Sequence, residues 1–191
     1  NPDPTVIKAE DGYFYLYATG GNTWIHKSKD LVHWTYVGGA YEDDKKPSWE
    51  PEAGIWAPDI NYINGKYVMY YSLSKWGGGA TCGIGVSVSD KPEGPFTDQG
   101  KLFCSNEIDV HNSIDPFYIE DNGKKYLFWG SWYGIWGIEL TEDGLGLKGG
   151  IENAKATKIQ VAANTGGTNA YEGSYILKRG KYYYLFCSTG T

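Results

Sequence analysis

Four segments of the chain share one pattern of hydrophobic and polar positions. Each begins with a carboxylate, continues as a short apolar run, turns at a dipeptide that contains glycine, and resumes as a run rich in Tyr and Phe. Short apolar runs on both sides of such a turn predict β-hairpins rather than helices. The four segments are residues 3–20, 59–74, 115–131 and 172–190.

The turn dipeptides strengthen this prediction. An Asx-Gly pair between two strands is a strong hairpin signal, because both central residues of a type I′ turn need a positive φ. The four dipeptides are Asp11-Gly12, Asn64-Gly65, Asn122-Gly123 and Arg179-Gly180.

The leading acids of these segments recur at a nearly constant spacing. They are Asp3, Asp59, Asp115 and Glu172, separated by 56, 56 and 57 residues. Further strands are expected between the hairpins, within 24–34, 82–96 and 134–147, so that each unit contains about four strands. We interpret 152–163 as strand and loop rather than as a weak helix. Repeated units of four strands are typical of propeller blades, and helical solenoids do not fit the pattern.

The repeat also sets the domain organisation. Residues 1–191 are expected to form a single all-β domain whose units start near 3, 59, 115 and 172, which makes about three and a half blades. Propellers usually close with four to eight blades. We therefore expect the chain to be an internal part of a larger propeller.

Composition and charge exclude several classes of partner. The chain has 17 Lys and Arg against 23 Asp and Glu, a net charge of −6, which argues against nucleic acid and anionic membranes. No apolar run approaches the roughly 18 residues of a membrane helix, and the start Asn1–Pro4 lacks the pattern of a signal peptide. Cys82, Cys104 and Cys187 form no CxxC motif, so we expect buried free thiols rather than a zinc site.

The acids and the aromatic residues suggest the chemistry. The innermost strands of propeller blades converge on one axis, so acids at equivalent positions would form a ring there. Such a ring can bind a hard cation, contact sugar hydroxyls in a non-catalytic binding module, or hydrolyse glycosides, because grouped carboxylates push their pKa values apart. The 8 Trp, 17 Tyr and 6 Phe supply platforms for sugar rings, which favours the glycosidase.

Six short motifs follow one another at blade spacing. They are PDPTVI (2–7), SKDLVHW (28–34), WAPDI (56–60), NSIDPF (112–117), FWGSWYGIWGIEL (128–140) and YEGSYI (171–176). In this order, over the whole chain, they resemble glycoside hydrolase family 43, whose members are five-bladed β-propellers. The resemblance implies an inverting hydrolase of arabinose- or xylose-containing polysaccharides.

The resemblance assigns roles to three acids. Asp3 matches the general base that activates water, Asp115 matches the acid that tunes and orients the proton donor, and Glu172 matches the general acid. Inversion needs room for a water, so the carboxyls of Asp3 and Glu172 are expected roughly 6.5–9.5 Å apart.

Further positions match the family's substrate contacts. Trp56 matches the sugar-stacking Trp, and Gly77 lies in a loop that approaches the pocket. Asn112, Ser131 and Trp132 match substrate-contacting positions.

Other polar residues are given structural roles. For Asp59 we favour hydrogen bonding within its own blade over a substrate contact. His111 is interpreted as a structural residue, and His26 and His33 as surface or packing residues. The family's axial His belongs to a fifth blade that lies outside this chain. The resemblance requires no cofactor for the chemistry and leaves room for a structural calcium ion in the complete protein.

The prediction of the substrate rests on the local motifs. The segments around Ser131 and Glu172 look most like arabinan-cleaving members, both endo-1,5-α-L-arabinanases and α-L-arabinofuranosidases. A β-xylosidase of the same family and a non-catalytic carbohydrate-binding propeller remain the alternatives. Retaining fructan-cleaving propellers fit less well, since their Glu-Cys element is Glu172-Gly173 here. The polymeric substrate implies an extracellular or periplasmic location, with no nucleic-acid partner and no membrane span.

Overall fold

The computed structural model describes residues 1–163 and 170–190, and its strands form four antiparallel sheets. The first sheet contains β1 (Thr5–Lys8), β2 (Phe14–Ala18), β3 (Trp24–Ser28) and β4 (Thr35–Gly39). The second contains β5 (Gly54–Ile63), β6 (Lys66–Ser74), β7 (Gly83–Ser89) and β8 (Thr97–Cys104). The all-β class predicted from the sequence is confirmed.

The third and fourth sheets complete the described part of the chain. The third contains β9 (Phe117–Asp121), β10 (Lys124–Trp129), β11 (Ile135–Glu139) and β12 (Ile159–Ala162), and the fourth contains β13 (Ala170–Arg179) and β14 (Tyr182–Gly190). Two short helices lie between strands, α1 (Ser105–Ile108) and α2 (Gly150–Thr157). The strand and loop expected over 152–163 is therefore wrong for its first half. Glycine precedes this helix and a run of small and polar residues forms it, so hydrophobic periodicity gave no signal.

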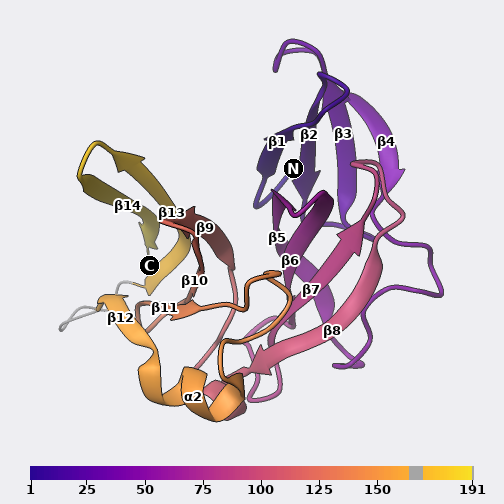
Figure 1. The fold of residues 1–191 in the computed structure, drawn as a ribbon. Helices are drawn as coiled ribbons and strands as arrows, with labels where there is room; N and C mark the ends of the chain where they lie inside the picture. The colour runs from indigo at the N-terminus through magenta and orange to yellow at the C-terminus, as the bar shows by residue number, and fades with distance from the viewer. Residues whose placement is uncertain (164–169, 191) are drawn as a thin grey trace.

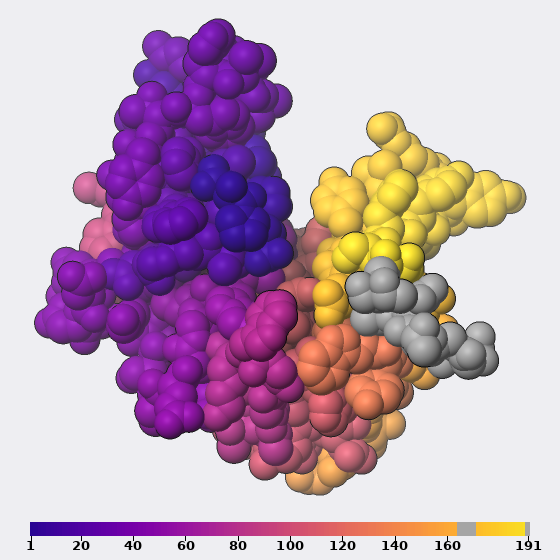
Figure 2. Space-filling model, turned by 180° about the vertical axis from the view of Figure 1, so that it is seen from behind, coloured from indigo at the N-terminus to yellow at the C-terminus, as the bar shows by residue number. Residues whose placement is uncertain are grey.

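The first strand of each sheet lies next to the first strand of the following sheet. Contacts join β1 to β5, β5 to β9, and β9 to β13. The sheets thus follow one another around an arc, with the chain start at their inner side (Figure 1). Seen from behind, the N-terminal and C-terminal sheets face each other across an open gap (Figure 2).

Two of the predicted turns have the expected backbone. Asn64-Gly65 and Asn122-Gly123 have φ of 50° and 81°, and of 51° and 75°. Each pair joins directly paired strands, as a two-residue type I′ turn requires. At Asp11-Gly12 only the glycine has a positive φ, and the connection from β1 to β2 is longer.

The hydrophobic core lies between consecutive sheets. One cluster joins the first two sheets around Tyr15, Tyr17 and Met69, and the other joins the second and third around Phe103 and Trp129, all of them fully enclosed. Most hairpin tyrosines of these three sheets are core residues. In the fourth sheet, by contrast, Tyr175, Tyr182, Tyr183 and Tyr184 are 49–58% exposed.

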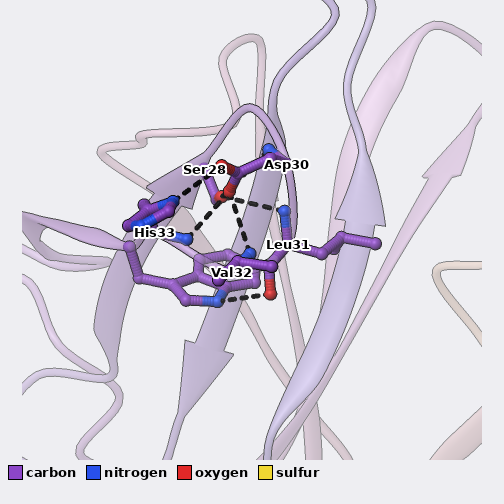
Figure 3. Close-up of polar contacts among 6 residues, drawn as sticks. Ser28, Asp30, Leu31, Val32 and His33 are labelled. Carbon is purple, nitrogen blue, oxygen red and sulfur yellow. Dashed lines mark hydrogen bonds and ion pairs between the residues drawn. The ribbon is translucent and has the colours of Figure 1, made fainter.

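The SKDLVHW motif forms the turn between β3 and β4 (Figure 3). The Asp30 carboxylate accepts the backbone N–H of Val32 at 2.9 Å and that of His33 at 2.8 Å, and its Oδ2 lies 2.8 Å from His33 Nδ1. The contact with the His33 ring and these N–H groups hold the pKa of Asp30 well below its usual range. His33 is thus a surface turn residue, in line with its sequence interpretation, and the motif serves the fold.

Cys82 and Cys104 are buried free thiols, as expected, and Cys187 is free and partly buried. In the part of the chain that the structure describes, no helix has the length and apolar character needed to cross a membrane.

Candidate active site

Each of the four sheets has one residue in the left-handed backbone region within its first strand or two residues before it. These residues are Asp3, Ala57, Asp115 and Gly173, with φ of 49°, 42°, 59° and 62°. The first three are each followed by proline. The same unusual conformation in four sheets marks these positions as structural equivalents.

This equivalence corrects the interpretation of the repeated acids. Asp3 and Asp115 are equivalent, but Asp59 lies two residues after Ala57 and Glu172 one residue before Gly173. β-Bulges interrupt the pairing of β5 between Trp56 and Asp59, and that of β13 between Glu172 and Tyr175. A bulge inserts a residue on one strand and redirects its side chains, so the constant spacing of the acids did not reflect one structural position.

Three of the acids meet in a single cavity. Asp3, Asp115 and Glu172 line a cavity of about 410 Å³, and each comes from a different sheet. The structure therefore brings together the three residues to which the sequence assigned catalytic roles. Asp59 does not line this cavity.

The Asp3 side chain is exposed to solvent, and one hydroxyl orients it. Thr19 Oγ1 donates a hydrogen bond to Asp3 Oδ2 at 2.6 Å. Within residues 1–163 and 170–190 no second hydrogen bond to this carboxylate is found. Its Oδ1 can thus accept a proton from a bound water.

Asp115 is partly buried between the other two acids. Removal from water and the negative charges of Asp3 and Glu172 raise the pKa of Asp115 to about 7. Its Oδ2 accepts the Gly173 N–H at 3.2 Å, which ties it to the residue next to Glu172. Asp115 thus interacts electrostatically with both neighbouring acids.

The Glu172 side chain extends from β13 to the cavity, and a hydrogen bond from Ser131 holds its carboxylate. Ser131 Oγ donates a short hydrogen bond to Glu172 Oε1, and Ser131 itself is 1% exposed. Ser131 is thus placed as a partner of Glu172. The substrate contact assigned to it remains a prediction.

Asp59 connects three sheets. Its Oδ2 accepts the Tyr118 N–H of the third sheet at 2.8 Å and Asn61 Nδ2 of its own sheet at 2.8 Å. Thr5 Oγ1 of the first sheet lies 3.5 Å from its Oδ1. Burial raises the pKa of Asp59 to about 7, against the opposing effect of these hydrogen bonds. The expected hydrogen bonding is present, but it is not confined to one blade as the sequence interpretation held.

The other predicted substrate contacts surround the acids. Trp56, Gly77, Asn112 and Trp132 line the same cavity. Asn112 is 3% exposed and its Oδ1 has no hydrogen-bond partner among the described residues. An unpaired buried amide oxygen at a cavity wall is suited to accept a hydrogen bond from a ligand hydroxyl.

Glycines allow two of these side chains to take their places. A Cβ on Gly54 would lie 2.8 Å from Trp56 Nε1, so the indole rests directly on this backbone. A Cβ on Gly78 would lie 2.7 Å from Asn112 Oδ1. The tryptophan platform and the buried amide therefore both depend on a neighbouring residue without a side chain.

Sequence reasoning missed four cavity residues, Lys75, Trp76, Gly78 and Ile114. Trp76 is 96% exposed, and Lys75 Nζ lies 3.4 Å from Glu52 Oε2. The run KWGGGA was a usable signal, because a tryptophan beside three glycines cannot be a core residue of a strand.

His111 lies on the surface beside two aromatic residues, and the described residues form no candidate metal site. His111 is exposed, and its ring lies 5.7 Å from that of Trp132 and 5.2 Å from that of Tyr133. No group of three or more His, Cys, Asp or Glu side chains within 1–163 and 170–190 is placed to hold a metal ion. These residues alone do not fit a calcium site, so we assign no step to a metal.

The comparison with known families decides the relationship of the chain. Residues 1–191 match the profile of Glycosyl hydrolases family 43 along their whole length. The chain belongs to this family. A curated family 43 relative, arabinan endo-1,5-alpha-L-arabinosidase A of Aspergillus niger, is 33% identical over 193 residues, which cover 98% of this chain and 58% of that protein. The chain therefore spans less than two thirds of this relative's length.

Solved structures give the same relationship. The native arabinanase of Bacillus subtilis superimposes with a TM-score of 0.81 at 30% identity, covering 98% of this chain and 65% of that chain. The α-L-arabinanase of Cellvibrio cellulosa complexed with arabinohexaose superimposes with a TM-score of 0.78 at 27% identity, covering 100% and 65%.

Proposed function

We propose that the complete gene product is an inverting glycoside hydrolase that cleaves α-L-arabinofuranosyl linkages in arabinan or arabinose-containing polysaccharide. One observation carries this proposal: Asp3, Asp115 and Glu172 come from three sheets and line one cavity. The names of the family 43 relatives, among them an arabinan endo-1,5-alpha-L-arabinosidase and an arabinanase complexed with arabinohexaose, support the substrate class.

The roles of the acids follow from their surroundings. Asp3, exposed and oriented by Thr19, acts as the general base that takes a proton from water. Glu172, the longest of the three side chains, acts as the general acid that protonates the leaving glycosidic oxygen. Asp115 contacts the backbone N–H next to Glu172 and keeps this part of β13 in place.

The cavity walls orient the sugar. The indole rings of Trp56 and Trp132 offer flat apolar surfaces to sugar rings. The Asn112 amide oxygen accepts a hydrogen bond from a sugar hydroxyl. Binding in one orientation brings the glycosidic oxygen to Glu172 and leaves space for a water at Asp3.

The proposal includes the architecture and location of the complete protein. We propose a five-bladed propeller in which the present chain supplies three four-stranded blades and the first hairpin of the fourth. The polymeric substrate implies action outside the cytoplasm. A calcium ion, if the complete protein binds one, would need ligands from the remaining blades.

The test is reducing-sugar release by the complete gene product from linear 1,5-arabinan, with β-1,4-xylan beside it. We expect cleavage of arabinan and a loss of several orders of magnitude in kcat for Glu172→Gln, because the amide cannot donate the required proton. Glu152→Gln, an exposed glutamate on α2, is the matched control and should retain full activity.

The alternative functions predict other outcomes. Cleavage of xylan alone would keep the mechanism and replace the substrate by that of a β-xylosidase. Binding of either polysaccharide without hydrolysis would contradict the proposal in favour of a carbohydrate-binding module.

A further inference from the structure

A hydroxyl group contacts each of the three catalytic carboxyl residues. Thr19 Oγ1 donates to Asp3 Oδ2 at 2.6 Å, and Ser131 Oγ donates to Glu172 Oε1. Ser72 Oγ accepts the backbone N–H of Asp115 at 2.9 Å. Each hydroxyl lies at or near the end of the second strand of its sheet: Thr19 directly follows β2, Ser72 lies two residues before the end of β6, and Ser131 lies two residues after β10.

Thr19 and Ser72 occupy corresponding places in their sheets, and Ser131 lies one residue beyond that place. Thr19 pairs through its N–H with the carbonyl of Pro2, the residue before Asp3, at 3.1 Å. Ser72 pairs with Trp56, the residue before Ala57. In the third sheet Gly130 takes this place, opposite Ile114 at 2.9 Å, and Ser131 follows it by one residue. Glu172, the acid that Ser131 contacts in the fourth sheet, is also offset by one residue, because Gly173 occupies the position equivalent to Asp115.

Each hydroxyl also reaches from its own sheet to the next one. Thr19 Oγ1 accepts the N–H of Ala57 at 2.8 Å, so it links the first sheet to the second while it holds Asp3. Ser72 links the second sheet to Asp115 of the third, and Ser131 links the third to Glu172 of the fourth. The left-handed residues and their neighbours are therefore held across every sheet boundary in the described chain.

Burial makes these contacts specific. Ser72 is 0% and Ser131 1% exposed, and Thr19 is partly buried. A buried hydroxyl that loses its hydrogen-bond partner destabilises the folded protein, so each of these groups holds its partner in one geometry. Catalysis is sensitive to such geometry, because a misplacement of about 1 Å can lower a rate on the order of 10²-fold.

We infer that Thr19, Ser72 and Ser131 are positioning residues that align the three catalytic carboxyls across the sheet boundaries. This inference rests on the proposed function. It assigns no substrate contact to Thr19 or Ser72, and it gives Ser131 a positioning role in place of the substrate contact predicted from the sequence. Removal of the hydroxyls should therefore lower kcat and leave KM nearly unchanged.

The experiment compares variants of the complete gene product on linear 1,5-arabinan. Thr19→Val, Ser72→Ala and Ser131→Ala remove one hydroxyl each, and we expect each to lower kcat on the order of 10²-fold with KM within about twofold of wild type. Thr19→Ser keeps the hydroxyl without the methyl group and should restore most of the activity. Melting temperatures of all variants show whether they are folded.

The control is Ser74→Ala. Ser74 lies two residues after Ser72 on the same strand, is fully buried, and its Oγ has no hydrogen-bond partner among the described residues. The substitution removes the same atom from the same strand without breaking one of the contacts above. We expect its kcat to match that of wild type.

The outcomes separate this inference from the proposed function. An active wild type whose Ser72→Ala variant behaves like Ser74→Ala overturns the positioning role alone. A rise in KM without a change in kcat overturns it too and makes the hydroxyl a substrate contact. If Thr19→Val lowers kcat and Thr19→Ser lowers it equally, the methyl group of Thr19 matters rather than its hydroxyl, and Thr19 is a packing residue. A folded wild type that cleaves neither arabinan nor xylan overturns the proposed function and the positioning role together.

Discussion

Asp59 and Asp115 are two carboxyls of one chain with similar pKa values and different causes. Burial and the charges of two neighbouring acids raise the pKa of Asp115, whereas burial alone raises that of Asp59. Asp115 shares a cavity with both Asp3 and Glu172, whereas Asp59 lies outside that cavity and is hydrogen-bonded to residues of three sheets. The electrostatic coupling of Asp115 to its neighbours suits a role in catalysis. The burial of Asp59 affects the stability of the protein instead.

Asp59 should make the stability of the protein depend on pH. Its folded pKa is about 7, against an ordinary value of 3.8, so between about pH 4 and 7 the unfolded chain ionises this group and the folded chain does not. Unfolding then releases a proton, and the free energy of unfolding falls as the pH rises, by up to about 1.4 kcal/mol per pH unit. Below about pH 4 Asp59 is protonated in both states, so it does not make the free energy of unfolding depend on pH. Above about pH 7 it is ionised in both states, and the free energy of unfolding has fallen by its full amount.

Asp59→Asn has no titrating group at this position and tests the effect. Urea unfolding of wild type and variant from pH 4 to 8 gives the difference between their free energies of unfolding, in which Asp115 and all other groups cancel. We expect the free energy of unfolding of wild type to fall relative to that of the variant as the pH rises from about 4 to 7. A difference that stays constant with pH would show that Asp59 titrates as an ordinary carboxyl.

The residue scale also shows where sequence reasoning ends. Asp3, Asp115 and Glu172 were found because short motifs surround each of them. The hydrogen bonds of Asp59 to other sheets were not predicted, because its partners Thr5 and Tyr118 lie 54 and 59 residues away. Thr19 and Ser72 were missed for the same reason: a single hydroxyl carries no local signal until the sheets are placed side by side.

At the scale of elements, the hairpins were predictable where the turn chemistry is local. Asn64-Gly65 and Asn122-Gly123 specify their turns through the two positive φ values alone. The bulges of β5 and β13 were not predicted, because the short apolar runs that indicated these strands carry no signal for a single inserted residue. The acids next to them were consequently assigned to one equivalent position that they do not share.

Two glycines of the second sheet should respond differently to alanine. Gly83 pairs with Cys104, and a Cβ there would lie 2.2 Å from the Phe103 carbonyl oxygen and 2.5 Å from Cys104 Cα, so β7 and β8 would have to separate. Gly65 has open space around it and a φ of +81°. We expect Gly65→Ala to cost about 1 kcal/mol through backbone strain and Gly83→Ala about 3 kcal/mol or more through overpacking.

Thermal unfolding of both variants measures this order. Wild type and the two variants are compared under one condition, with circular dichroism at low temperature as the check that each is folded. Equal losses of stability would mean that β7 and β8 can adjust to a methyl group between them.

At the scale of the whole molecule, the cavity exists only where sheets meet. Each of the three cavity acids belongs to a different sheet, whereas the hydrogen bonds of a strand lie within its own sheet. Small shifts between sheets should therefore abolish activity before they change secondary structure. We expect the complete gene product to lose arabinan cleavage at a lower urea concentration than its far-ultraviolet circular dichroism signal.

Both quantities are measured on the same samples at equilibrium, with intrinsic tryptophan fluorescence as a third signal for Trp56 and Trp132 in the cavity. Coincident transitions for all three would indicate that the sheets separate and unfold in a single cooperative step.

The hydroxyl contacts across the sheet boundaries all run in one direction along the chain. Thr19 of the first sheet meets Ala57 of the second, Ser72 of the second meets Asp115 of the third, and Ser131 of the third meets Glu172 of the fourth. A ribosome releases the sheets in this same order, and N-terminal units generally fold first. Each newly made sheet thus finds its docking partner already in place on the sheet before it, so that the site can be assembled step by step while the chain is still being synthesised.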